Sequence, residues 1–146
     1  MKVYQALTAI VFAATGFAAQ AQMTPLGLWK NIDDKTGEAK AEIRITEKDG
    51  QLSGRIEKTL RKNTPADAVC TECSDDRKGQ PVVGLEILRG GKQTEGKNLW
   101  EGGKVLDPES GKEYRGSLTP IEGGARMELR GYWGPFWRTQ TWVRIQ

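Results

Sequence analysis

Hydrophobic and polar residues alternate in short stretches along the chain after residue 22, and glycine, asparagine, aspartate or proline separates these stretches. The segment from residue 39 to residue 45 is the clearest case, because its alanines and isoleucines alternate with charged residues. A period of two is typical of a β-strand that has one buried and one solvated face. No long segment has the period of an amphipathic helix. The pattern therefore predicts an all-β fold.

The alternation predicts about eight strands, joined by short turns with one exception. Lys48-Asp49-Gly50 has the composition of a hairpin turn, in which glycine provides the positive φ that tight hairpins need. Alternation is lost over residues 61–81, where we expect a long irregular connection. The predicted strands are residues 26–32, 39–45, 52–60, 82–88, 98–106, 114–118, 125–133 and 138–145.

Eight strands linked mainly by hairpins favour one architecture, an antiparallel up-and-down barrel that closes on itself. Closure removes exposed strand edges, and an eight-stranded interior is either filled by side chains or just wide enough for one small ligand. A β-sandwich is the alternative.

The N-terminus has the features of a secretory signal peptide. Lys2 precedes an apolar run over residues 6–19, and Ala19-Gln20-Ala21 provides the small residues that signal peptidase requires. We therefore expect residues 1–21 to be removed and residues 22–146 to form a single β-barrel domain, periplasmic or secreted. The apolar run is too short for a membrane span with a stop-transfer pattern, so we expect no integral membrane association.

Charge and composition exclude several classes of function. The 22 basic and 19 acidic residues are interleaved, which does not produce the basic patch of a nucleic-acid-binding protein. The chain has no histidine, and this excludes Ser-His-Asp and Cys-His catalysis and imidazole-bound zinc. Its acidic turns lack the spacing of a calcium loop. We predict no catalytic residue, cofactor or metal, and we expect a monomer.

Cys70 and Cys73 are the only cysteines and lie within the predicted irregular connection. An exported protein experiences an oxidising environment, where a disulfide is the expected state of such a pair. A catalytic thiol pair is the alternative, but Asp75 and Asp76 nearby would raise a thiol pKa instead of lowering it. We therefore interpret the pair as a structural disulfide.

The six residues from Tyr132 to Trp137 contain four aromatic rings around a Gly-Pro turn. Strand alternation sends Tyr132 and Trp133 to opposite faces, so at least one large ring is exposed or lines an opening. We take Tyr132, Trp133, Phe136 and Trp137 as candidate ligand-binding residues. A hairpin whose rings cap the barrel end is the equally weighted alternative.

The first and last predicted strands contain Gly27-Leu28-Trp29 and Trp142-Val143-Arg144. This pair of motifs resembles the calycin barrels, the lipocalin and streptavidin group, in which a tryptophan of the first strand packs beneath an arginine of the last. The resemblance implies that Trp29 and Arg144 close one end of the barrel. A guanidinium stacks favourably on an indole ring.

A second resemblance spans the whole mature chain. It rests on residues 25–29, the Cys-x-x-Cys loop leading into residues 78–85, residues 100–108, residues 110–114, and Arg130-Gly131-Tyr132 before residues 138–142. These blocks resemble the bacterial exported family catalogued as domain of unknown function family 2147, a name that implies no activity.

Together these features predict an exported barrel that binds a small apolar ligand, or a peptide or glycan segment, at an aromatic-lined mouth. The alternative is an interaction module whose barrel is solidly packed and whose loops contact another protein of the cell envelope. A cavity of roughly 300 Å³ or more would distinguish the two.

Overall fold

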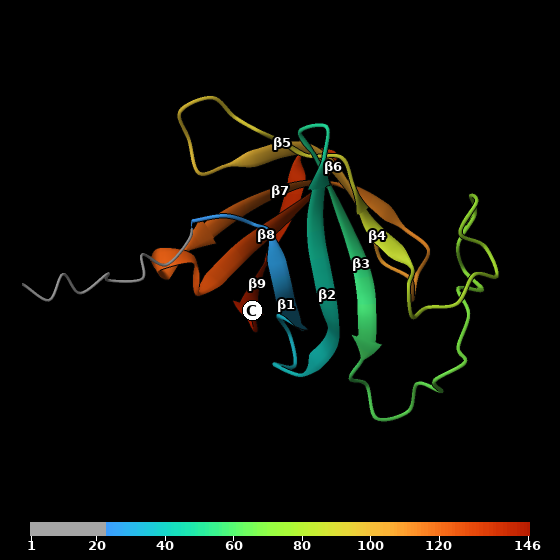
Figure 1. Ribbon diagram of the computed structural model, residues 1–146. Helices are drawn as coiled ribbons and strands as arrows, with labels where there is room; N and C mark the ends of the chain where they lie inside the picture. Colours follow the sequence, from blue (N-terminus) through green and yellow to red (C-terminus); the bar gives the residue numbers. More distant parts are fainter. Residues whose placement is uncertain (1–22) are drawn as a thin grey trace, which may run out of the picture.

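A computed structural model describes residues 23–146, and it confirms the predicted all-β barrel. One sheet contains every strand, in the order β4-β3-β2-β1-β9-β8-β7-β6-β5, and β4 also pairs with β6. The β4–β6 pairing closes an eight-stranded antiparallel barrel and leaves β5 outside it (Figure 1). The strands are β1 (Gly27–Ile32), β2 (Ala39–Lys48), β3 (Gln51–Thr59), β4 (Glu86–Arg89), β5 (Lys92–Gln93), β6 (Trp100–Leu106), β7 (Glu113–Ile121), β8 (Arg126–Trp133) and β9 (Phe136–Arg144), with a short 3-10 turn at Glu122–Gly124.

The core follows from the alternation in the sequence. On β2, Ala41, Ile43 and Ile45 are buried, whereas the charged residues between them are partly exposed. The same inward positions on the other strands bring large side chains to the barrel axis. The most completely buried of them are Trp29, Ile43, Ile45, Leu52, Leu88, Leu118, Met127 and Trp142.

Two of the turns at one end of the barrel have the same construction. Residues 33–38 join β1 to β2, and residues 107–112 join β6 to β7. In each, the aspartate carbonyl accepts a hydrogen bond from the amide of a glycine four residues later, as in Gly37 to Asp33 and Gly111 to Asp107. Both glycines have φ near +74°, a conformation that favours glycine.

Apart from shifts of up to three residues at other strand ends, the strand predictions differ from the structure in two places. The predicted strand at residues 82–88 begins only at Glu86, because Val82 and Gly84 instead hydrogen-bond to Ala68 and Ile56 outside the β3–β4 ladder. Residues 92 and 93 form β5 inside a segment predicted to be a turn. Both residues of β5 are exposed polar side chains, so no hydrophobic period marks them, and β5 with its following loop projects from the barrel (Figure 1).

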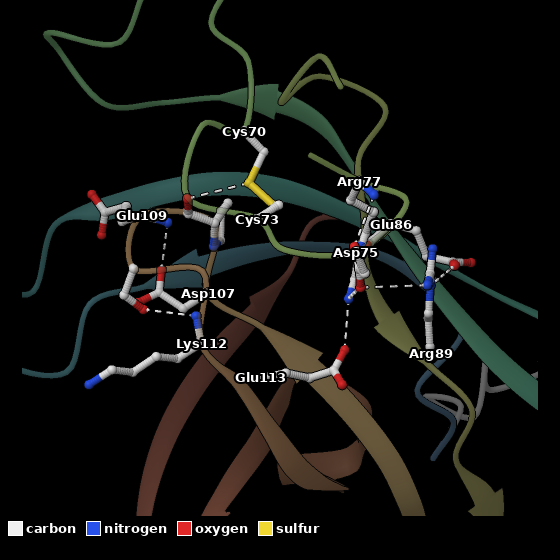
Figure 2. Close-up of a disulfide and its surroundings, with 12 residues drawn as sticks. Cys70, Cys73, Asp75, Arg77, Glu86, Arg89, Asp107, Glu109, Lys112 and Glu113 are labelled. Carbon is white, nitrogen blue, oxygen red and sulfur yellow. Dashed lines mark hydrogen bonds and ion pairs between the residues drawn. A yellow bond between two sulfur atoms is a disulfide. The ribbon is translucent and has the colours of Figure 1, made fainter. Parts of the chain in front are cut away.

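The connection between β3 and β4 covers residues 60–85, so it contains the irregular segment predicted at residues 61–81 and is longer than it. It has several fixed contacts. Cys70 and Cys73 form the predicted disulfide, and both are buried. Arg77 is also buried, and its guanidinium bonds Asp75 at 2.5 Å and Glu113 of β7 at 2.7 Å (Figure 2). A third bond joins Arg77 to the backbone oxygen of Glu86, so this one side chain ties the connection to two strands.

Among residues 23–146, no helix is long and apolar enough to cross a membrane. The predicted signal peptide lies outside the described residues, so it stays a prediction, as does the division of the chain at residue 22.

Candidate functional site

The barrel contains a cavity of about 440 Å³. Residues of all eight barrel strands line it, and its opening lies between the turn at residues 33–38, the β3–β4 connection, the turn at residues 107–112 and the β8–β9 hairpin. The deeper wall is mainly apolar and includes Ala41, Ile43, Ile56, Ile87, Leu129 and Trp142.

A few polar side chains interrupt this apolar wall. Asn31 of β1 and Gln140 of β9 line the cavity, as do Thr59 and Tyr114. Gln140 accepts a hydrogen bond from the indole nitrogen of Trp142 at 3.3 Å. The Oδ1 atom of Asn31 is buried and has no hydrogen-bond partner in the described part of the chain. Apolar walls with a small number of polar groups are typical of small-molecule sites.

The β8–β9 hairpin brings three of the four candidate aromatic residues to the cavity opening. Trp133, Phe136 and Trp137 all line the cavity, and their exposed fractions are 71%, 68% and 63%. Tyr132 does not line it. The ring of Tyr132 instead lies under the guanidinium of Arg115 on β7, at 5.9 Å from carbon to centroid. The structure thus places Trp133 and Tyr132 in different surroundings, as strand alternation predicts.

Charged residues around the opening are paired with one another. Lys40 of β2 lies 2.8 Å from Asp33 and 3.8 Å from Glu109, and Glu109 also pairs with Arg61. These pairs link the two Asp-x-x-x-Gly turns and the start of the β3–β4 connection across the opening. The hydrogen bond from Lys40 holds the pKa of Asp33 well below its ordinary value, so this carboxylate remains ionised.

A further ion pair joins the aromatic hairpin to the β1–β2 turn. Arg138, which lines the cavity, bonds both carboxylate oxygens of Asp34. This bond lowers the pKa of Asp34 and raises that of Arg138. The base of the hairpin is therefore tied to a neighbouring turn, while its tip, with Trp133, Phe136 and Trp137, is exposed.

The opposite end of the barrel is closed by side chains. Trp29 is completely buried, and its indole nitrogen donates a hydrogen bond to the Pro25 carbonyl at 2.8 Å. Arg144 lies over the Trp29 ring and bonds the carbonyl oxygens of Thr24, Leu26 and Gly124. The cavity therefore opens at one end of the barrel only, the end that carries the aromatic hairpin.

The polar members of the cavity were not among the predicted site residues. On β9, Phe136, Arg138 and Gln140 all line the cavity, at intervals of two residues from the buried Trp142. Every second residue of a strand faces the same side, so the two-residue period that ends at Trp142 could have identified Arg138 and Gln140. Asn31 similarly lies two residues after Trp29, whereas Arg61 and Glu109 come from loops and have no such signal.

Sequence comparison matches residues 27–144, which span every strand of the barrel, to a family of uncharacterized proteins conserved in bacteria, DUF2147. The chain belongs to this family. The match confirms the resemblance seen in the sequence blocks. No curated protein sequence matches this DUF2147 protein.

A solved structure with a similar fold is protein HP1028 from the human pathogen Helicobacter pylori, which is described as belonging to the lipocalin family. The two chains are 16% identical, and the superposition covers 83% of this DUF2147 chain and 82% of HP1028 with a TM-score of 0.70. The similarity confirms the calycin-like barrel. At this level of identity it extends to the fold alone.

Proposed function

We propose that this protein binds a small, mainly apolar molecule inside its barrel. The cavity of about 440 Å³ is the observation that carries the proposal. Small-molecule sites are usually clefts or cavities of roughly 300 to 1,000 Å³ with apolar walls and a few polar groups. The walls formed by Ile43, Ile56 and Leu129, with Asn31 and Gln140 among them, fit that description. HP1028 has the same fold and is described as a lipocalin, which adds support.

The cavity favours this proposal over an interaction module with a packed barrel, because a solid interior would leave no such volume. A peptide or glycan segment remains a second candidate ligand. The observation that favours it is the position of Trp133, Phe136 and Trp137 at the opening, where exposed rings can stack against a chain that does not enter the barrel.

We also propose that the protein acts in the periplasm or outside the cell. The buried Cys70–Cys73 disulfide supports this, because disulfides persist in oxidising compartments and are rare in the cytosol. The signal-like N-terminus in the sequence supports it independently.

A titration with the apolar fluorescent dye N-phenyl-1-naphthylamine tests binding in the cavity. Two variants add side-chain volume to the wall: Ala41→Leu, and Gly131→Val, whose added Cβ would lie at an ordinary 3.7 Å from the Tyr114 Cβ. We expect each to weaken dye binding about tenfold, since filling a cavity removes the space that the ligand needs. Glu42→Leu is the matched control, because Glu42 follows Ala41 on β2 and does not line the cavity.

Equal dye binding by all four proteins would place the dye elsewhere and remove the support for a cavity ligand. Native mass spectrometry of protein purified from its own host would then identify any molecule that remains bound. Loss of that molecule from Ala41→Leu, but not from Glu42→Leu, is the result we expect.

A further inference from the structure

The tip of the β8–β9 hairpin exposes more aromatic surface than any other described segment. Trp133, Phe136 and Trp137 surround the Gly134-Pro135 turn and are each more than 60% exposed, whereas the other three tryptophans are buried. Leaving apolar rings in water is unfavourable, and clustered exposed rings commonly mark a surface that contacts a partner or a membrane.

Two arginines each lie over one aromatic ring of this hairpin. The Arg130 guanidinium lies over the Trp137 ring and that of Arg115 over the Tyr132 ring, each at 5.9 Å. In the ladder Arg115 pairs with Tyr132, and Tyr132 pairs with Trp137, so the four residues form a continuous strip. Neither arginine forms an ion pair with any residue in the described part of the chain, unlike Arg138 beside them.

We propose that this hairpin docks the barrel on the surface of an anionic lipid bilayer. Tryptophan and tyrosine favour the interface between water and lipid, where the ring is buried among the upper acyl chains and its polar edge stays hydrated. Unpaired arginines beside the rings add attraction to anionic headgroups. The strip from Arg115 to Trp137 therefore has both components of an interfacial anchor.

The shape of the tip favours a membrane over a protein partner. A stable protein interface buries about 800 Å² on each partner and involves roughly 20 to 30 residues a side. The exposed rings are three side chains that flank a two-residue turn, far fewer than the residues of a stable protein interface, and three rings are enough to enter a headgroup layer.

Docking by this hairpin would turn the cavity opening toward the bilayer, because Trp133, Phe136 and Trp137 also line that opening. An amphiphile could then pass between the lipid and the barrel without crossing water. The docking itself does not depend on whether the cavity holds a ligand, so it can be tested separately.

The test measures co-sedimentation with vesicles of phosphatidylglycerol and phosphatidylethanolamine, and with vesicles of phosphatidylcholine alone. Wild-type protein and every variant are produced with the same N-terminus. We expect wild-type protein to bind the anionic vesicles with a blue shift of its tryptophan fluorescence. Trp133→Ala with Trp137→Ala should weaken this binding about tenfold or more, since it removes two exposed rings that the proposal places in the bilayer. Trp133→Phe with Trp137→Phe should restore most of it.

The electrostatic component has its own variants. Arg115→Gln with Arg130→Gln should weaken binding at low salt about thirtyfold, as expected for two basic groups near a charged surface, and should reduce its salt dependence. Arg126→Gln changes an exposed arginine that pairs with Glu122, and Ile145→Ala truncates a side chain that is 41% exposed near the opposite end of the barrel. Both controls should bind like wild type.

Three results would overturn the proposal. The first is that wild-type protein does not bind anionic vesicles. The second is that wild type and the double alanine variant bind them equally. The third is that wild-type protein is a dimer without vesicle binding and the double alanine variant is a monomer. The third would assign the hairpin to contact with a second copy of the chain. Ala41→Leu should retain vesicle binding, which separates failure of docking from failure of the cavity proposal.

Discussion

The guanidinium carbon of Arg144 lies 4.2 Å from the centroid of the Trp29 ring. The two residues pair across β1 and β9, so this contact joins the first and last strands of the barrel. Burial lowers the pKa of Arg144. Its hydrogen bonds to the carbonyl oxygens of Thr24, Leu26 and Gly124 and its contact with the Trp29 indole stabilise the charged guanidinium in place of water.

Replacing Arg144 should therefore destabilise the barrel. We expect Arg144→Met to lower the free energy of unfolding by about 2 to 4 kcal/mol, because three partly buried carbonyl groups lose their donor. Arg144→Lys should recover little, since an ammonium group cannot reproduce the planar fork of the guanidinium. Urea unfolding provides the measurement. Arg126→Met on the surface is the control and should change the free energy of unfolding by less than about 0.5 kcal/mol. An equal effect of the two methionine variants would contradict a stabilising role for Arg144 at the end of the barrel.

The disulfide should contribute to stability without determining the fold. Cys73 follows Cys70 by three positions, so the disulfide closes a very short loop. Such a loop lowers the entropy of the unfolded chain and thereby stabilises the folded protein by about 2 kcal/mol. We expect Cys70→Ser with Cys73→Ser to unfold at lower urea concentration but to keep the far-ultraviolet circular dichroism of the barrel. Wild-type protein should show no alkylatable thiol when denatured without reductant. Loss of the β-sheet spectrum in the double variant would mean that the barrel needs the disulfide to fold.

Gly111 should tolerate substitution much less well than Gly37, although the two occupy equivalent positions in similar turns. Their φ angles are +73° and +74°, so alanine introduces similar backbone strain at both. A Cβ atom at Gly111 would overlap the carbonyl oxygen of Glu72, between the disulfide cysteines, whereas nothing lies within 4 Å of the equivalent atom at Gly37. We expect Gly111→Ala to lower the free energy of unfolding by about 1 to 3 kcal/mol more than Gly37→Ala does, which is the usual cost of overpacking.

Thermal unfolding of the two alanine variants measures this difference. Hydrogen exchange should also show increased opening of residues 70–80 in Gly111→Ala only, because that substitution separates the β3–β4 connection from the β6–β7 turn. Equal stability and equal exchange in the two variants would mean that Glu72 moves away from the added Cβ atom without lowering the free energy of unfolding.

Stability should decrease in acid because of the ion pairs on the β3–β4 connection. The hydrogen bond from Arg77 holds the pKa of Asp75 far below its ordinary value of 3.8. A carboxylate whose pKa is lower in the folded than in the unfolded protein stabilises the fold above the unfolded pKa, and this contribution is lost as pH falls below it. We expect the free energy of unfolding to begin to fall below about pH 4.

Asp75→Asn should reduce stability at neutral pH and weaken this acid dependence, as measured by urea unfolding over a series of pH values. Asp67→Asn is the control, because Asp67 is exposed and forms no ion pair within residues 23–146. An Asp75→Asn variant with the acid dependence of wild type would assign the effect to other carboxylates, such as Asp33 with its Lys40 partner.

Local sequence determined much of the barrel. Alternation placed β2 and β3, and Asp49-Gly50 marked the reversal between them, because period-two patterning and positive φ are local properties of a chain. The Cys70–Cys73 bond was equally predictable, since its partners are near neighbours. The aromatic hairpin stood out for the same reason.

Tertiary structure decided which distant groups meet. The Leu88–Val105 and Arg89–Lys104 pairs join β4 to β6 and close the barrel without β5. Arg77 bonds Glu113, which lies 36 residues later in the chain. No local pattern specifies such contacts, because each depends on how strands far apart in the chain are brought together by closure. The cavity depends on closure as well: its volume is the space left among side chains from all eight barrel strands and their loops, and that remainder exists only once the strands have closed around it.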